Sequence, residues 1–166
     1  SSVGIGAGYE WQVYYDLKTD SVVKRHRKDI WHLGFECAPG GYHIVLNTSM
    51  IMGAAIVENR SFKEITDTSG LAWRRDVPSG NLDSTAIGKW WKSGNEEIQS
   101  KDRVYVIEKG IDDIGRSLGF VKMEILGFEN DKYRIKFAGL EDQQTHTLDI
   151  PKNSDLNYIS VSFDDG

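Results

Sequence analysis

Apolar and polar residues alternate with a period of two through most of this chain. The segments with this alternation are Trp31–Phe35, Tyr42–Leu46, Val121–Ile125, 133–137 and 159–163. Such alternation is typical of strands that bury one face. Pro39-Gly40-Gly41 and Asn130-Asp131 stand between alternating segments and predict tight reversals of the chain. The pattern therefore predicts antiparallel sheets.

Short strands at this spacing, in a chain of 166 residues, favour one domain. We expect an all-β fold, an antiparallel β-sandwich or barrel-like single domain with at most one or two short helices. Asp83 is a candidate cap for a short helix that runs towards Trp90. We assign residues 9–166 to this domain and the Gly- and Ser-rich residues 1–8 to a flexible N-terminal linker.

Charge and composition argue against several classes of protein. The formal net charge is −5, which disfavours binding to nucleic acid. The single cysteine, Cys37, excludes an internal disulfide framework. The sequence carries no P-loop, dinucleotide, nucleophile-elbow or metalloprotease motif. We therefore expect a binding protein and no catalysis.

The segment 67–99 departs from the alternating pattern. It is rich in Ser, Thr, Gly, Asp and Asn, yet it carries Trp73, Trp90 and Trp91. Exposed aromatic rings on a β scaffold stack on flat ligands or sugar faces. We expect at least one of the three to line a concave surface and the others to anchor the segment to the sheet. The alternative is a loop pinned to the core by all its aromatic rings.

Three further features have both a structural and a functional interpretation. Met50 and Met52 place two soft thioethers on one side of a strand, either as ligands beside a flat ring or as core fillers. His43 is either a ligand or a packed side chain. The basic run Lys24–Lys28 either contacts an anionic partner, such as a lipid headgroup, a propionate or a sulfated glycan, or is a solvated loop.

The order of these motifs resembles the HmuY family of haem-binding, haemophore-type bacterial outer-membrane lipoproteins. The matching segments are Glu10–Tyr15, Lys18–Val23, Trp31–Phe35, Tyr42–Asn47, Gly88-Lys89-Trp90, Arg103–Ile107 and Val121–Phe128. The resemblance implies an all-β fold, secretion, and a lipid anchor on a cysteine upstream of residue 1. It also implies a place in the cell envelope, on the outer membrane or its extracellular face, and delivery of haem to a TonB-dependent outer-membrane receptor.

The chain departs from the family in the residues that hold iron. The resemblance implies that family members with a histidine pair hold haem iron from a region corresponding to about Glu58–Lys101, and this sequence has no His or Met there. If haem binds, the candidate ligands are therefore Met50, Met52 and His43, together with the rings of Trp73, Trp90 and Trp91; the other possibility is that this member has lost haem binding. The alternative function is a carbohydrate-binding or surface-adhesion module that uses the three tryptophans as a stacking platform.

Overall fold

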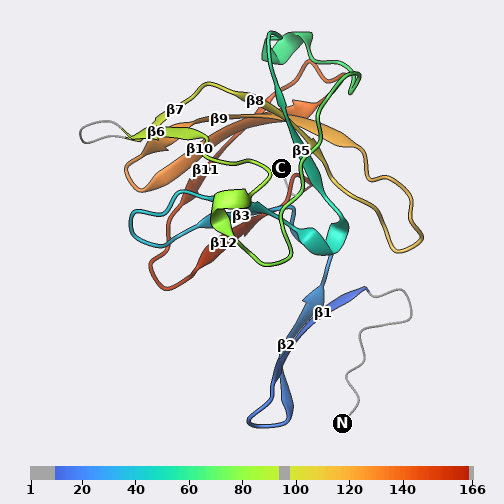
Figure 1. Cartoon of the computed structure of the whole chain (residues 1–166), viewed down its shortest axis with the longest axis vertical. Helices are drawn as coiled ribbons and strands as arrows, with labels where there is room; N and C mark the ends of the chain where they lie inside the picture. The colour runs from blue at the N-terminus through green and yellow to red at the C-terminus, as the bar shows by residue number, and fades with distance from the viewer. Residues whose placement is uncertain (1–9, 94–97, 165–166) are drawn as a thin grey trace.

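The computed structural model describes residues 10–93 and 98–164 (Figure 1). The predicted linker, residues 1–8, lies outside the described residues. Within the described ranges the regular structure consists of strands and three short 3-10 turns, η1 (Thr48–Met50), η2 (Phe62–Glu64) and η3 (Leu82–Ser84). The predicted all-β fold with antiparallel sheets is confirmed.

The short helix expected from Asp83 to Trp90 is limited to the turn η3. Its cap is Asn81, whose side-chain oxygen accepts a hydrogen bond from the backbone N–H of Asp83 at 3.0 Å. Thr85 is already extended, and Gly88 adopts a φ of +65°, which a right-handed helix does not use. The chain therefore leaves the helical conformation after one turn.

Two antiparallel sheets form the body of the molecule. The larger has the order β11-β10-β9-β8-β5 and the smaller has the order β12-β3-β4. The strands of the larger sheet are β5 (Gly53–Val57), β8 (Val104–Glu108), β9 (Phe120–Glu129), β10 (Lys132–Gly139) and β11 (His146–Pro151). Those of the smaller are β3 (Leu33–Glu36), β4 (Ile44–Leu46) and β12 (Tyr158–Val161).

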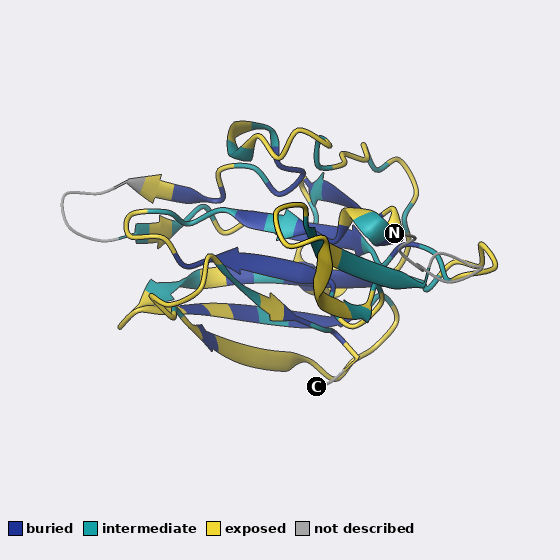
Figure 2. Ribbon diagram, turned by 90° about the horizontal axis from the view of Figure 1, so that it is seen from below, coloured by how far each residue is buried: buried dark blue, intermediate teal, exposed yellow. Residues whose placement is uncertain are grey.

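The main hydrophobic core lies between these two sheets. Phe35 and Ile44 from the smaller sheet pack in one cluster with Tyr105, Met123 and Ile135 from the larger one. Figure 2 shows that buried residues concentrate on the inner strands and exposed residues on the outer elements. Two sheets that bury their facing sides in one core make a β-sandwich.

The opposite face of the larger sheet is covered by the segment that contains η2. Phe62 and Ile65 from this segment pack on Val104 and Val106 of β8. Lys122 is buried beneath them, and its ammonium donates hydrogen bonds to the carbonyl oxygens of Ile65 (3.0 Å) and Leu140 (2.9 Å). The covering segment is thereby fixed to the sheet.

Two hairpins complete the fold. One consists of β6 (Trp91–Ser93) and β7 (Ile98–Ser100), and the other of β1 (Trp11–Asp16) and β2 (Ser21–Arg27). The β1–β2 hairpin extends away from the sandwich (Figure 1). At its base the Asn47 amide donates to the carbonyl oxygens of Lys28 (2.6 Å) and Trp31 (2.8 Å), so the attachment of the hairpin is defined.

No helical segment in the described ranges combines the length and the apolar character that crossing a bilayer requires.

Candidate functional site

Trp90 and Trp91 belong to the main core. Their side chains are 1% and 8% exposed, and their rings meet edge to face with centroids 5.7 Å apart. The indole N–H of Trp90 donates to the carbonyl oxygen of Tyr42 at 2.7 Å. The two rings therefore anchor the segment between η3 and β6 to the sandwich.

Trp73 lies elsewhere, at the surface. Its side chain is 37% exposed and its ring packs on Phe120, which belongs with the second cluster on the far face of the larger sheet. The prediction that the three tryptophans form one stacking platform is therefore wrong. Two of the rings are buried in the core, and the third lies on another face of the molecule. Trp90 and Trp91 anchor the segment to the core, as both the expectation and its alternative include for these two rings. That Trp73 lines a concave surface stays a prediction.

Met50 and Met52 are both buried in the main core, so the core-filler interpretation holds for them. Their predicted placement on one strand is wrong, because Met50 ends the turn η1, Ile51 adopts a left-handed conformation, and Met52 lies just before β5. His43 lies beside β6, where its Nδ1 is 2.6 Å from Oε2 of Glu36 and its ring meets Trp91 edge to face. The same Glu36 oxygen accepts the backbone N–H of His43 at 2.9 Å. The two thioethers thus have no open face for a ring ligand, and His43 has a carboxylate partner.

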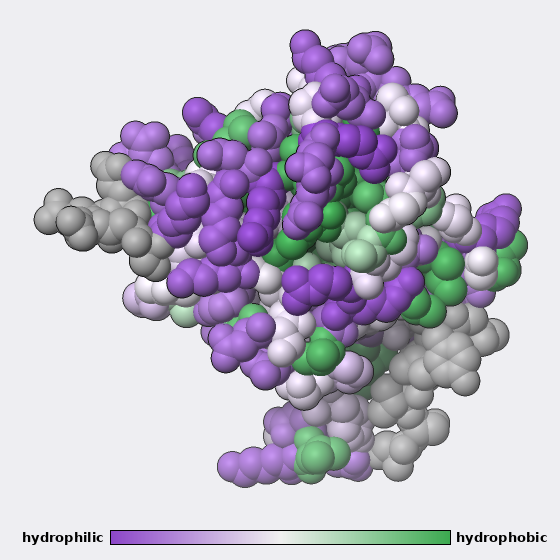
Figure 3. Space-filling view, turned by 45° about the horizontal axis from the view of Figure 1, so that its top comes forward, coloured by the Kyte–Doolittle hydropathy of each residue, from purple (hydrophilic) through white to green (hydrophobic). Residues whose placement is uncertain are grey.

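A surface groove lies at the edge of β5, lined by residues between Ile56 and Arg74. The cavity has a volume of about 560 Å³, with an apolar part formed by Ile56, Leu71 and Ala72. Its charged lining residues are Glu58, Arg60, which pairs with Asp67 at 3.8 Å, and Arg74. Backbone hydrogen bonds of 2.9 Å in both directions join Arg74 to Ala54 and extend the sheet past β5. We call this the β5-edge groove. Figure 3 shows an apolar strip between hydrophilic side chains on the face turned to the viewer.

Five basic side chains gather next to this groove. We call them the cationic cluster, and its members are Arg74, Lys89, Lys92, Lys101 and Arg103. Burial lowers the pKa of Lys101, and the nearby charges of Arg103, Lys89 and Lys92 lower it further. Within residues 10–93 and 98–164, no carboxylate lies within ion-pair distance of any of the five, although other basic side chains of the chain do form such pairs. The cluster is therefore a positive surface on a chain of negative net charge.

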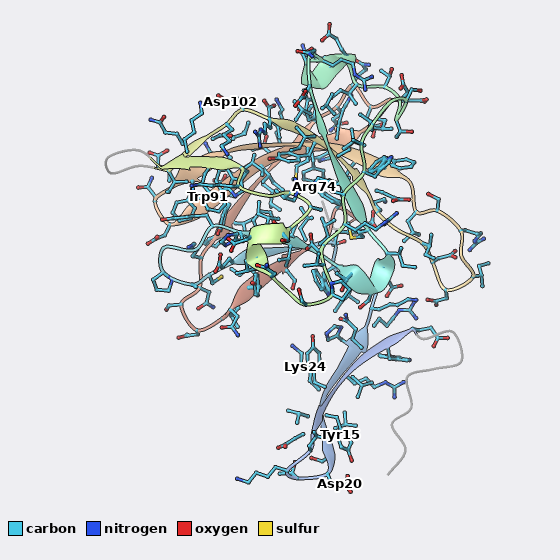
Figure 4. All side chains as sticks on the ribbon, viewed as in Figure 1. Tyr15, Asp20, Lys24, Arg74, Trp91 and Asp102 are labelled. Atoms are coloured by element: carbon cyan, nitrogen blue, oxygen red, sulfur yellow. The ribbon has the colours of Figure 1, made fainter. Side chains whose placement is uncertain are left out.

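Hydrogen bonds to backbone carbonyl oxygens hold two members of the cluster in place. Arg74 donates from Nη2 to the carbonyl oxygen of Thr85 at 3.2 Å, and Lys101 donates from Nζ to that of Lys89 at 2.6 Å. Figure 4 shows Arg74 on the segment beside β5, Trp91 on β6 and Asp102 just before β8. Because Arg74 also lines the β5-edge groove, the groove and the cluster are continuous.

Tyr105 adds a hydroxyl group to this region. Its side chain is fully buried, and its Oη has no hydrogen-bond partner in the part of the chain that the structure describes. Burial raises the pKa of this phenol, while Arg103 and Arg74 act in the opposite direction. Because the Tyr105 side chain is fully buried, its hydroxyl is enclosed beneath the cluster and is not part of the exposed surface.

Arg74, Lys101, Arg103 and Tyr105 were not among the candidate site residues expected from the sequence. A usable signal was present, because Lys89, Lys92, Lys101 and Arg103 fall within fifteen positions of an otherwise acidic chain.

Comparison with known protein families shows to which family this chain belongs. The HmuY protein family matches residues 8–155. This chain belongs to the HmuY family. The comparison with curated proteins gave no match, and neither did the comparison with solved structures. Four of the five members of the cationic cluster lie within the region 58–101, where the family resemblance implies a ligand site. The β5-edge groove is lined by residues of this region and by the end of β5 just before it.

Proposed function

We propose that this HmuY-family chain captures haem, or a similar flat ligand with carboxylate groups, at the β5-edge groove and the cationic cluster. The observation that carries the proposal is the set of five basic side chains without a described carboxylate partner, next to a groove that has both apolar and polar lining residues. A porphyrin with two propionates has the matching chemistry, because one part is flat and apolar and the other is anionic.

Two kinds of contact supply the affinity. Arg74 and Arg103 offer planar guanidinium groups, which bind carboxylates through paired hydrogen bonds. Each such bond contributes about 1.5–3 kcal/mol. Removal of the ring from water by Ile56, Leu71 and Ala72 contributes about 25 cal/mol per Å² of apolar area.

The residues in this region fit the ring and its carboxylates and do not fit the iron. Between Glu58 and Lys101 the chain has no histidine and no methionine. Met50 and Met52 are buried in the core, and His43 is hydrogen-bonded to Glu36. We therefore propose that binding rests on the ring and the propionates, without an axial ligand from this chain.

The test is a haemin titration followed by absorbance, with the double variant Arg74→Gln and Arg103→Gln. We expect the double variant to bind at least roughly tenfold more weakly, because two charge-assisted contacts are lost. Arg134→Gln is the matched control, since Arg134 is an exposed arginine that pairs with Asp149 on the neighbouring strand. Haemin binding that is absent in the parent chain, or that is equal in the double variant and the control, would reject the proposal.

The cell-envelope location, the upstream lipid anchor and the handover to a TonB-dependent outer-membrane receptor are part of the same proposal. Their support is membership of the HmuY family. Transfer is tested by mixing the haemin-loaded chain with membranes that contain the receptor, and a failure of the haemin to move would remove the handover from the proposal.

A further inference from the structure

A second groove lies between the β1–β2 hairpin and the outer face of the smaller sheet. Its volume is about 540 Å³, which is within the range of small-molecule sites. The hairpin contributes Tyr14, Lys24 and His26 to one wall. The smaller sheet and the segment before β3 contribute the opposite side. We call this the hairpin groove.

The floor of the hairpin groove is a row of small side chains. Ser160, Gly34 and Val45 are paired in register across β12, β3 and β4. A Cβ atom built on Gly34 would lie 2.9 Å from Cγ2 of Val45, 3.6 Å from the Tyr158 ring and 3.7 Å from the Trp31 ring, so Gly34 itself is buried by these neighbours. The accessible part of the floor is therefore formed by Val45 and Ser160, beside the Trp31 and Tyr158 rings, which also line the groove.

Aromatic rings also stand on the hairpin side of the groove. Tyr14 is 52% exposed, and its ring centroid is 5.6 Å from that of His26. Aromatic faces on two sides of a shallow slot are suited to pack against the C–H faces of sugar rings, which combine an apolar face with polar edges.

Several polar groups of the hairpin groove have no hydrogen-bond partner among the described residues. The side-chain Nδ1 of His26 lies 2.9 Å from the carbonyl oxygen of Arg27. Because a carbonyl can only accept, Nδ1 carries the proton, and Nε2 remains for another partner. The hydroxyls of Tyr14, Tyr158 and Ser160 have no hydrogen-bond partner among the described residues, so the groove offers several groups to the hydroxyls of a sugar.

The hairpin groove carries a positive charge, which favours an acidic ligand. No carboxylate is among its described lining residues. Within the basic run, Arg27 and Lys28 pair with Asp29 and Asp113, and Arg25 stacks on the Trp11 ring at 4.0 Å. Lys24 has no such partner in the described part of the chain, and it lines the groove.

We propose that the hairpin groove binds an acidic saccharide, through ring stacking on Trp31, Tyr158 and Tyr14 and through contacts of Lys24 and His26 with a carboxylate or sulfate group. This site is separate from the β5-edge groove and is independent of haem capture. It also gives the basic run a role that the sequence left open.

Isothermal titration calorimetry with three hexasaccharides tests the proposal. The probes are a sulfated chondroitin hexasaccharide, a hyaluronan hexasaccharide with carboxylates only, and neutral cellohexaose. We expect at least one acidic probe to bind roughly tenfold or more tightly than the neutral one, because a charge-assisted contact is added. The two acidic probes separate a sulfate from a carboxylate requirement.

Variants locate the binding. Lys24→Gln removes the charge, and Ser160→Leu fills the floor at an exposed position of β12. We expect either substitution to weaken binding by roughly tenfold. Lys18→Gln is the matched control, because Lys18 lies on the same hairpin in the turn between β1 and β2. Arg74→Gln should leave saccharide binding unchanged, which separates this site from the β5-edge groove.

Three results would overturn the proposal: no binding of either acidic probe, equal binding of all three probes, or binding that survives Ser160→Leu. Binding to vesicles of anionic phospholipid with no binding of the saccharides would equally overturn it, and would assign the basic run to a membrane surface.

Discussion

Replacement of Trp90 by alanine tests whether this tryptophan belongs to the core. Its side chain is 1% exposed, and its indole N–H donates to the Tyr42 carbonyl oxygen at 2.7 Å. A buried tryptophan removes about 200 Å² of surface from water, worth roughly 5 kcal/mol at 25 cal/mol per Å². Measured losses for such substitutions are about 3–5 kcal/mol. The unpaired Tyr42 carbonyl adds about 1 kcal/mol.

We therefore expect Trp90→Ala to lower the free energy of unfolding by about 4–5 kcal/mol, a large part of the roughly 5–15 kcal/mol that stabilises a typical domain. Trp73→Ala is the matched control, because this side chain is 37% exposed and rests on Phe120 at the surface. We expect it to cost about 1 kcal/mol. The milder Trp90→Phe keeps a ring in the core and should cost about 1–2 kcal/mol through the lost indole donor.

The assay is urea denaturation followed by far-ultraviolet circular dichroism, since fluorescence would lose one of its own reporters. A cost for Trp90→Ala below about 1.5 kcal/mol, or one no greater than that of Trp73→Ala, would refute the assignment of Trp90 to the core. It would also restore the idea that the tryptophans of this segment serve a ligand.

Two other predictions concern buried and paired charges. Lys122→Met keeps the length of the side chain but leaves the carbonyl oxygens of Ile65 and Leu140 without their donor, so we expect a loss of about 2–3 kcal/mol in urea denaturation; an unchanged midpoint would contradict this. The hydrogen bond from Arg27 holds the pKa of Asp29 below its ordinary value, so this pair stabilises the fold above about pH 4 and the contribution is lost as the pH falls through the lowered pKa. A carboxyl titration by NMR should show the low pKa in the parent chain and an ordinary one in Arg27→Gln.

Much of the fold could be predicted because a period of two reports directly which face of a strand is buried. Leu33 and Phe35 face the core with Gly34 between them on the outer face, as their alternation predicts. The pairing of the strands could not be predicted, because β12 pairs with β3 across more than a hundred residues. Such long-range contacts depend on the fit of whole faces, which local alternation does not encode.

The site was harder to predict than the fold. An indole in a polar segment gives the same sequence signal whether it packs inward, as Trp90 does, or remains at the surface, as Trp73 does. The cationic cluster forms only because the chain around Arg74 adds to β5, and β5 pairs with β8 next to Arg103. Charged residues that strand pairing brings together are far apart in the sequence, so the sequence around each one gives little sign of the cluster.

The most direct test of the proposed function compares haemin with metal-free protoporphyrin IX by quenching of tryptophan fluorescence. If the ring and the propionates carry the affinity at the β5-edge groove and the cationic cluster, the two dissociation constants should agree within about threefold, since the missing iron removes no protein contact. The absorbance spectrum of bound haemin should likewise show no sign of a histidine or methionine ligand. Haemin binding that is roughly a hundredfold or more tighter than protoporphyrin binding, with the spectrum of an axially ligated iron, would contradict the account and show that this chain holds the metal itself.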